Sequence, residues 1–307
     1  MFGLLKRNAA AKGRLGIAIG GDQLAFAIVQ RESGGQAILG RCETIPFAQD
    51  ATAEAATATL RALNLPRMPL SAVLLPEEYQ LALIEAPDVP PAELRAAMRW
   101  RLRDTIDFRV EDAVIDVFDV PPQSRGGQGR MMYAVAARRS SVDRQSTMLE
   151  SLNTLDVVDV PELCLRNLAG LLPAAANGVA LLYLGRQAAT VVLVRGTTFY
   201  FARQMNISGG GESAGRVSPE SVILELQRSL DYYERHFDQP PITRVAIAPF
   251  GAQAAALASD LGEESGFEVS LFDLNTALQC ASPVDDRTQA ACLLAVGAAL
   301  RHEHRSF

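Results

Sequence analysis

The segment "RLGIAIGGDQLAFAIVQR", residues 14–31, carries the strongest fold signal in this chain. An apolar run, a glycine pair and a second apolar run predict two antiparallel strands joined by a tight turn at Gly20-Gly21. The run "QAILGRCETIPF", residues 36–47, predicts a third strand of the same meander. Backbone N–H groups in such a turn can surround a phosphate, so the stretch raises the question of whether the chain binds a nucleotide.

The same pattern returns later in the chain, in "ALLYLGRQAATVVLVRGTTFYFARQ" at residues 180–204, where Gly185 aligns with Gly20. Each meander is followed by helices and a buried strand, which indicates two halves of the type βββαβα. A repeat separated by more than a hundred residues predicts two similar lobes facing one cleft. We therefore expect an α/β protein of the actin/hexokinase-like (ASKHA) class, with the turns at Gly20 and Gly185 facing each other across the cleft.

The segment between the two meanders predicts a small α/β insert in the first lobe. It contains an extended run, a helix that starts at a proline pair, two strands and a second helix, and "PPQSRGGQGR", residues 121–130, is typical of a flexible hairpin loop. We expect the insert to pack on the first lobe only. The expected divisions are a flexible tail at 1–12, the first lobe at 13–77 and 155–177, the insert at 78–154, and the second lobe at 178–307 with a loop and helical part at 206–240.

Composition and charge exclude some classes of function and indicate where the protein works. The chain has 307 residues, 49% of them hydrophobic, and a formal charge of −6, which argues against non-specific binding to nucleic acid. No apolar run reaches the roughly 20 residues that cross a bilayer, and the first residues do not resemble a secretory signal, so we expect a cytoplasmic protein. Each of the four cysteines lies among apolar neighbours, which indicates reduced structural thiols; they are Cys42, Cys164, Cys280 and Cys292.

The nucleotide site of this fold shows losses in the sequence. Actin-like ATPases carry Asp-x-Gly at both turns, where the aspartate holds Mg²⁺, but here those positions are Ala18 and Tyr183. The adenine-side glycine pair is replaced by Pro249-Phe250-Gly251, which places a ring where a base would approach. We expect no catalytic residue, no metal site and no resident cofactor, with weak binding of ATP and Mg²⁺ as the alternative. The candidates for a degenerate nucleotide site are Gly20, Gly21, Asp22, Gly185, Gly251 and Ala252.

Four stretches, in this order, carry a resemblance to a known family: "GIAIGGDQLAFAIVQ", "MRWRLRDTIDFRVEDAVIDVFDV", "ELQRSLDYYERHFDQPPITRVAIAPFGA" and "LLAVGAALR". Together they span nearly the whole chain, and it resembles the PilM-like proteins of type IV pilus assembly, most of all their mannose-sensitive haemagglutinin (MSHA) branch. The resemblance implies an actin-like component at the cytoplasmic face of the inner membrane, held there by the N-terminal tail of a bitopic partner. Three roles stay open: a non-catalytic scaffold, an actin-like ATPase or switch of pilus or type II secretion assembly, and a module that recruits a motor ATPase.

A partner-binding surface is predicted on the helix "AELRAAMRWRLRDTIDF", residues 92–108. Leu94, Met98 and Leu102 form an apolar stripe that is typical of a core-facing side. The opposite side is basic, and the single tryptophan lies between its arginines and the apolar stripe. This side is either a solvated face or a docking edge for a peptide or for anionic lipid headgroups. The resemblance implies that the partner's tail lies between the insert and the first lobe, near this helix. The candidate residues are Arg95, Arg99, Trp100 and Arg103.

Overall fold

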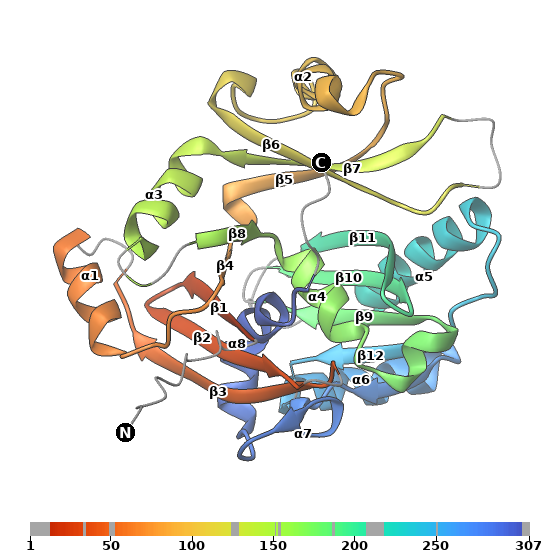
Figure 1. Cartoon of the computed structure of the whole chain (residues 1–307). Helices are drawn as coiled ribbons and strands as arrows, with labels where there is room; N and C mark the ends of the chain where they lie inside the picture. The colour runs from red at the N-terminus through yellow and green to blue at the C-terminus, as the bar shows by residue number, and fades with distance from the viewer. Residues whose placement is uncertain are drawn as a thin grey trace, which may run out of the picture.

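The computed structural model describes residues 13–32, 35–48, 53–123, 129–150, 152, 155–185, 188–206, 218–249 and 251–302. Its chain forms two lobes, each built on one sheet, with a third, smaller sheet above them (Figure 1). The tail at 1–12, most of the loop at 206–217, part of the loop at 121–130 and Phe250 lie outside the described residues. No helix of the described part is both long enough and apolar enough to cross a membrane.

The first lobe contains a six-stranded sheet in the order β14-β3-β2-β1-β4-β8. The predicted meander is confirmed, because β1, β2 and β3 pair antiparallel in sequence order, and Gly21 takes the positive φ of 62° that the tight turn requires. Helix α1 (Ala53–Ala62) packs beside this sheet. The strands are β1 (Gly13–Gly20), β2 (Gln23–Arg31), β3 (Ala37–Pro46), β4 (Leu70–Val73), β8 (Leu155–Asp159) and β14 (Gln279–Cys280).

The second lobe repeats this topology. Its sheet has the order β11-β10-β9-β12-β13, which matches β3-β2-β1-β4-β8 of the first lobe strand by strand. Ala18 pairs with residues of β2 and β4, and Tyr183 pairs with the corresponding residues of β10 and β12, so the two positions are equivalent. Helices α5 (Pro219–His236) and α6 (Ala252–Ser265) belong to this lobe, and its strands are β9 (Val179–Leu184), β10 (Ala188–Arg195), β11 (Thr198–Asn206), β12 (Arg244–Ala248) and β13 (Glu268–Leu271).

Two helices join the lobes, and their packing contradicts the predicted boundary between the lobes at residue 178. The last long helix, α8 (Asp286–Ala299), packs on β1 and β2 of the first lobe, and β14 extends the first sheet beside β3. Helix α4 (Pro161–Ala169) packs on α8 and on β9 and β10 of the second lobe; short elements η3 (Pro173–Asn177) and α7 (Leu274–Ala277) connect these parts. Assigning all of 178–307 to the second lobe was therefore wrong, because an apolar helix sequence does not specify which sheet it covers.

The insert forms a separate three-stranded sheet in the order β5-β7-β6, made of β5 (Tyr79–Glu85), β7 (Met131–Arg138) and β6 (Ala113–Asp119). Helix α2 (Pro91–Leu102) covers the face of this sheet that points away from the lobes, and Leu94, Met98 and Leu102 are buried there, as the apolar stripe predicts (Figure 1). Helix α3 (Arg139–Leu149) returns to α1 in the first lobe. Short 3-10 turns, η1 (Pro76–Glu78) and η2 (Val110–Asp112), precede β5 and β6.

The insert also contacts the second lobe, so the expectation that it packs on the first lobe only was wrong. The rings of Phe118 and Tyr133 lie 5.6 and 5.4 Å from the ring of Phe199 on β11. The amide of Ala202 donates a hydrogen bond to the Tyr133 hydroxyl at 3.1 Å, and Gln123 donates one to the hydroxyl of a tyrosine on α5 at 2.9 Å. Aromatic residues on a strand indicate a buried face, but the sequence does not say which lobe buries it.

Candidate functional site

A cleft of about 560 Å³ opens between the lobes. Both glycine turns line it, through Gly20 and Gly21 from the first lobe and Gly185 from the second. The prediction that the two turns face one cleft is therefore confirmed. Ala18 and Tyr183 line the same cleft at their equivalent places in the two sheets.

The cleft has few charged side chains among the residues that the structure describes. Of those that line it, Glu77 and Arg287 carry charge. Burial raises the pKa of Tyr183 to about 12, so its phenol is neutral near pH 7 and is a poor ligand for a hard cation. Thr190, the cross-strand partner of Tyr183, is buried and also lines the cleft.

Three of the proposed nucleotide-site residues do not line the cleft. Asp22 follows the first turn, and its carbonyl accepts a hydrogen bond from the amide of Phe47 at 2.9 Å. Gly251 and Ala252 begin α6, and neither is among the lining residues. The structure brings together Ala18, Gly20, Gly21, Tyr183 and Gly185, whereas the proposed role of Phe250 lies outside the described residues.

A second, larger depression of about 840 Å³ lies between the insert and the two lobes, and we call it the groove. It is bordered by β6 of the insert, β8 of the first lobe, α4, and the β10–β11 turn at Thr197 and Thr198. Strands β6 and β8 each stand at the end of their sheet. The groove therefore runs between two sheet edges, and its walls are largely apolar; they include Leu74, Phe118, Val135, Val158, Leu163 and Phe199.

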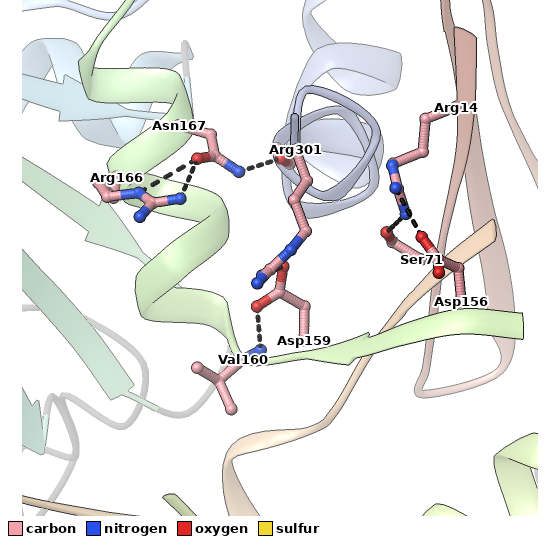
Figure 2. Close-up of polar contacts among 9 residues, drawn as sticks. Arg14, Ser71, Asp156, Asp159, Val160, Arg166, Asn167 and Arg301 are labelled. Carbon is pink, nitrogen blue, oxygen red and sulfur yellow. Dashed lines mark hydrogen bonds and ion pairs between the residues drawn. The ribbon is translucent and has the colours of Figure 1, made fainter. Parts of the chain in front are cut away.

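The floor of the groove holds ion pairs between distant parts of the chain (Figure 2). Asp159, whose side chain is only 1% exposed, pairs with Arg301 at 2.7 Å and accepts a hydrogen bond from the amide of Val160 at 3.0 Å. Asp156 pairs with Arg14 at 2.6 Å. These pairs cancel the charge of the floor carboxylates and hold β8 against β1 and the residues that follow α8.

The resemblance implied a partner site between the insert and the first lobe, but sequence reasoning named none of the residues that line the groove, although one signal for them exists. Along β6, Ala113, Ile115 and Val117 are buried under α2, while the alternate residues Asp116 and Phe118 are only partly buried. Such an alternation on a strand already covered by a helix indicates a second, half-buried face. That second face is the wall of the groove.

None of the predicted partner-binding residues lines the groove; they lie on or next to α2, on the other side of the insert sheet. Arg95 pairs with Asp116, a groove residue, at 3.2 Å. Arg99 donates to the carbonyls of Val110 and Ala113 at 3.0 and 3.3 Å, so it holds η2 in place. The guanidinium of Arg103 lies 4.0 Å from the centre of the Trp100 ring on the outer side of α2.

These contacts change the expected role of α2. Neither the groove nor the interlobe cleft includes an α2 residue among its lining residues, so the structure does not bring Trp100 to either. The two carbonyl bonds of Arg99 indicate that an Arg99→Glu substitution would destabilise the insert.

A third cavity, of about 440 Å³, separates β5 from β11. The buried side chains of Tyr79 and Glu162 line it, and the tyrosine hydroxyl donates to the carboxyl group at 2.6 Å. Burial raises the pKa of Glu162, and its hydrogen bond with Tyr79 opposes that change. The pair links β5 of the insert to the first turn of α4.

Comparison with known proteins defines the class of the fold. No protein-family model matches the chain, and no curated protein matches it. Among solved structures, a chain of the PilM-PilN type IV pilus biogenesis complex superposes with a TM-score of 0.69 at 21% identity, covering 94% of this chain and 98% of that one. The protein therefore has the actin-like ATPase fold, in agreement with the fold predicted from the sequence.

Two further solved structures are similar. A Bacteroides thetaiotaomicron protein with an actin-like ATPase fold and unknown function superposes with a TM-score of 0.53 at 10% identity, covering 95% of this chain and 99% of that one. The cytoplasmic domain of EpsL, an inner membrane component of the Vibrio cholerae type II secretion system, gives 0.46 at 13% identity, covering 82% and 95%.

Proposed function

We propose that this chain is a PilM-like, non-catalytic scaffold of a type IV pilus assembly platform, of the kind that MshI provides for the MSHA pilus. Its partner is the cytoplasmic N-terminal tail of a bitopic inner-membrane protein, which keeps the chain at the cytoplasmic face of that membrane. A motor ATPase is a further proposed partner. The solved chain that resembles this one over 94% of its length comes from a complex of two pilus biogenesis proteins, which supports the proposal.

The groove between two sheet edges is the observation that carries this function. Edge strands expose backbone N–H and C=O groups that an extended peptide can pair with as an added strand. Strand β8 has five residues, enough to pair with a peptide segment about 16 Å long. Apolar walls offer sites for alternate side chains of the peptide, and the paired charges of the floor do not favour a strongly charged segment.

Three parts of the fold meet at the groove, and this favours a scaffold. The insert supplies β6, the first lobe supplies β8, and the second lobe supplies Thr197 to Phe199. A bound tail would contact all three and would order them relative to one another.

We propose further that the interlobe cleft does not hydrolyse ATP. Ala18 and Tyr183 occupy equivalent places in the two lobes, where neither side chain can hold Mg²⁺ or its waters. The alternative is an actin-like ATPase or an ATP-dependent switch of pilus or type II secretion assembly. Titration of the protein with ATP and Mg²⁺ distinguishes the non-catalytic scaffold from the ATPase or switch.

Site-specific photo-crosslinking in cells tests the groove. A photoreactive amino acid replaces Val114 on β6 or Val157 on β8, both of which line the groove, and the control position is Leu224, an exposed residue on α5. The groove positions should crosslink to the N-terminal tail of an inner-membrane protein, identified by mass spectrometry, while Leu224 should not. Crosslinks to the tail from Leu224 alone, or none from either groove position, would place the partner elsewhere.

A further inference from the structure

Trp100 is an exposed aromatic side chain that lines neither the groove nor the cleft. It is 69% exposed, more than any other large hydrophobic residue in the described part of the chain. The stripe of Leu94, Met98 and Leu102 already fills the buried side of α2. An indole on the outer side of this helix therefore adds nothing to the core of the insert.

Three arginines around Trp100 form no ion pair with a carboxylate among the described residues. Arg99 is bound by backbone carbonyls, and Arg103 lies over the indole ring. Arg101 is exposed, and none of the ion pairs among the described residues involves these three arginines. Residues 91–104 carry four arginines against two acidic residues, so this helix is locally cationic in a chain of net charge −6.

The surface around Trp100 is the outer side of a single helix. Ala92, Ala96 and Trp100 follow one another along the exposed side of α2, and Arg103 comes directly after the helix; we call this set, with Arg99 and Arg101 beside it, the α2 surface. Figure 1 shows α2 on the outer side of the insert sheet, away from β8 and the lobes. A protein hot spot usually fills a pocket from which water is excluded, and Trp100 lines none of the three cavities described above.

We propose that the α2 surface rests on anionic lipid headgroups. Indole rings favour the headgroup level of a bilayer, where the apolar ring and the N–H group are both satisfied. Guanidinium groups beside the ring are attracted to phosphatidylglycerol-type headgroups. At about 0.1 M salt the Debye length is about 10 Å, so the local cations act on the membrane while the distant acids are screened.

This proposal rests on the proposed function, because a tail bound in the groove holds the insert close to the bilayer. Once the tail is bound, the contact between the α2 surface and the bilayer is effectively intramolecular. It therefore needs only a low intrinsic affinity for lipid. The groove and α2 lie on opposite sides of the insert sheet. Roughly six extended residues of the tail would cover the distance past one sheet and one helix, about 20 Å.

The fluorescence of Trp100 tests the proposal directly, because it is the only tryptophan in the chain. The full chain is mixed at about 0.1 M salt with phosphatidylcholine vesicles that contain phosphatidylglycerol, and with pure phosphatidylcholine vesicles. Emission should shift to shorter wavelength with the anionic vesicles only, and about 1 M salt should reverse the shift. Arg101→Glu with Arg103→Glu should reduce the vesicle-bound fraction about tenfold or more.

The matched control reverses two exposed arginines of the first lobe, Arg61→Glu with Arg67→Glu, and should bind vesicles like the unmodified protein. Equal losses in both double variants would mean that net charge alone governs binding, and would overturn the proposal. An unchanged emission with anionic vesicles would also overturn it, and a shift produced by the purified partner without lipid would assign Trp100 to a protein contact. The vesicle assay contains no partner, so its outcome is independent of the crosslinking test of the groove.

Discussion

Two glycines set how closely α8 approaches its neighbours. A Cβ atom on Gly16 of β1 would lie 1.9 Å from the carbonyl oxygen of Ala295, and one on Gly297 would lie 2.5 Å from that of Cys164 on α4. Real Cβ atoms do not approach backbone oxygen so closely, so a methyl group at either position must push α8 away from β1 or from α4. Because α8 and α4 join the lobes, these glycines determine how the two halves fit together.

Gly16→Ala and Gly297→Ala should each lower the free energy of unfolding by about 3 kcal/mol, the upper part of the range for overpacked cores. Urea denaturation followed by circular dichroism measures the change. Gly262→Ala is the matched control, because a Cβ atom there meets open space and alanine favours the helix by up to about 1 kcal/mol. Wild-type stability in either buried variant would contradict the close contact at α8.

At the scale of elements, the insert is held on two sides. Tyr79 of β5 bonds to Glu162 of α4, and Tyr133 of β7 accepts a hydrogen bond from Ala202 of β11. The first contact depends on protonation, because burial raises the pKa of Glu162 above 4.5. Compared with the unfolded chain, the folded protein therefore shifts Glu162 toward its neutral form.

The sign of the pH effect follows from that raised pKa. The folded state binds the proton of Glu162 more tightly than the unfolded chain does, so the resulting stabilisation is complete below about pH 4.5 and is lost as pH rises through the folded pKa. Glu162→Gln stays neutral, so its stability relative to the wild type should increase between about pH 4.5 and pH 8. Urea midpoints across that range measure it, with Glu77→Gln, an exposed carboxylate, as the control. A constant difference between Glu162→Gln and wild type would show that Glu162 does not titrate as inferred.

At the level of the whole molecule, two lobes of the same topology face one cleft, which we propose does not hydrolyse ATP. Gly20 and Gly185 both line this cleft, and Ala18 and Tyr183 line it at equivalent positions of the two sheets. Isothermal titration with ATP and Mg²⁺ should show no binding tighter than roughly 1 mM, about −4 kcal/mol. Micromolar affinity that Gly20→Val weakens would restore the ATPase alternative, and Gly262→Val is the control at an open position.

Local pattern accounts for what the sequence predicted correctly. The strand-turn-strand repeat depends on neighbouring residues, because an apolar run and a glycine turn are properties of a short segment, and Gly21 takes a positive φ at the first of these turns. The buried stripe of α2 follows from helical spacing for the same reason. Since the two meanders carry the same local pattern, their repetition was enough to predict the actin-like fold.

The apolar faces of the strands and helices and the positions of the turns follow from the order of the residues. What those faces meet depends on the tertiary fold: α8 covers the first sheet, and Phe118 packs against Phe199 of the second lobe. The groove arises in the same way, because β6 and β8 come from separate sheets and border it only once the insert is in place. The apolar pattern of a sequence predicts that a residue is buried. Which residue it packs against depends on contacts between segments far apart in the chain.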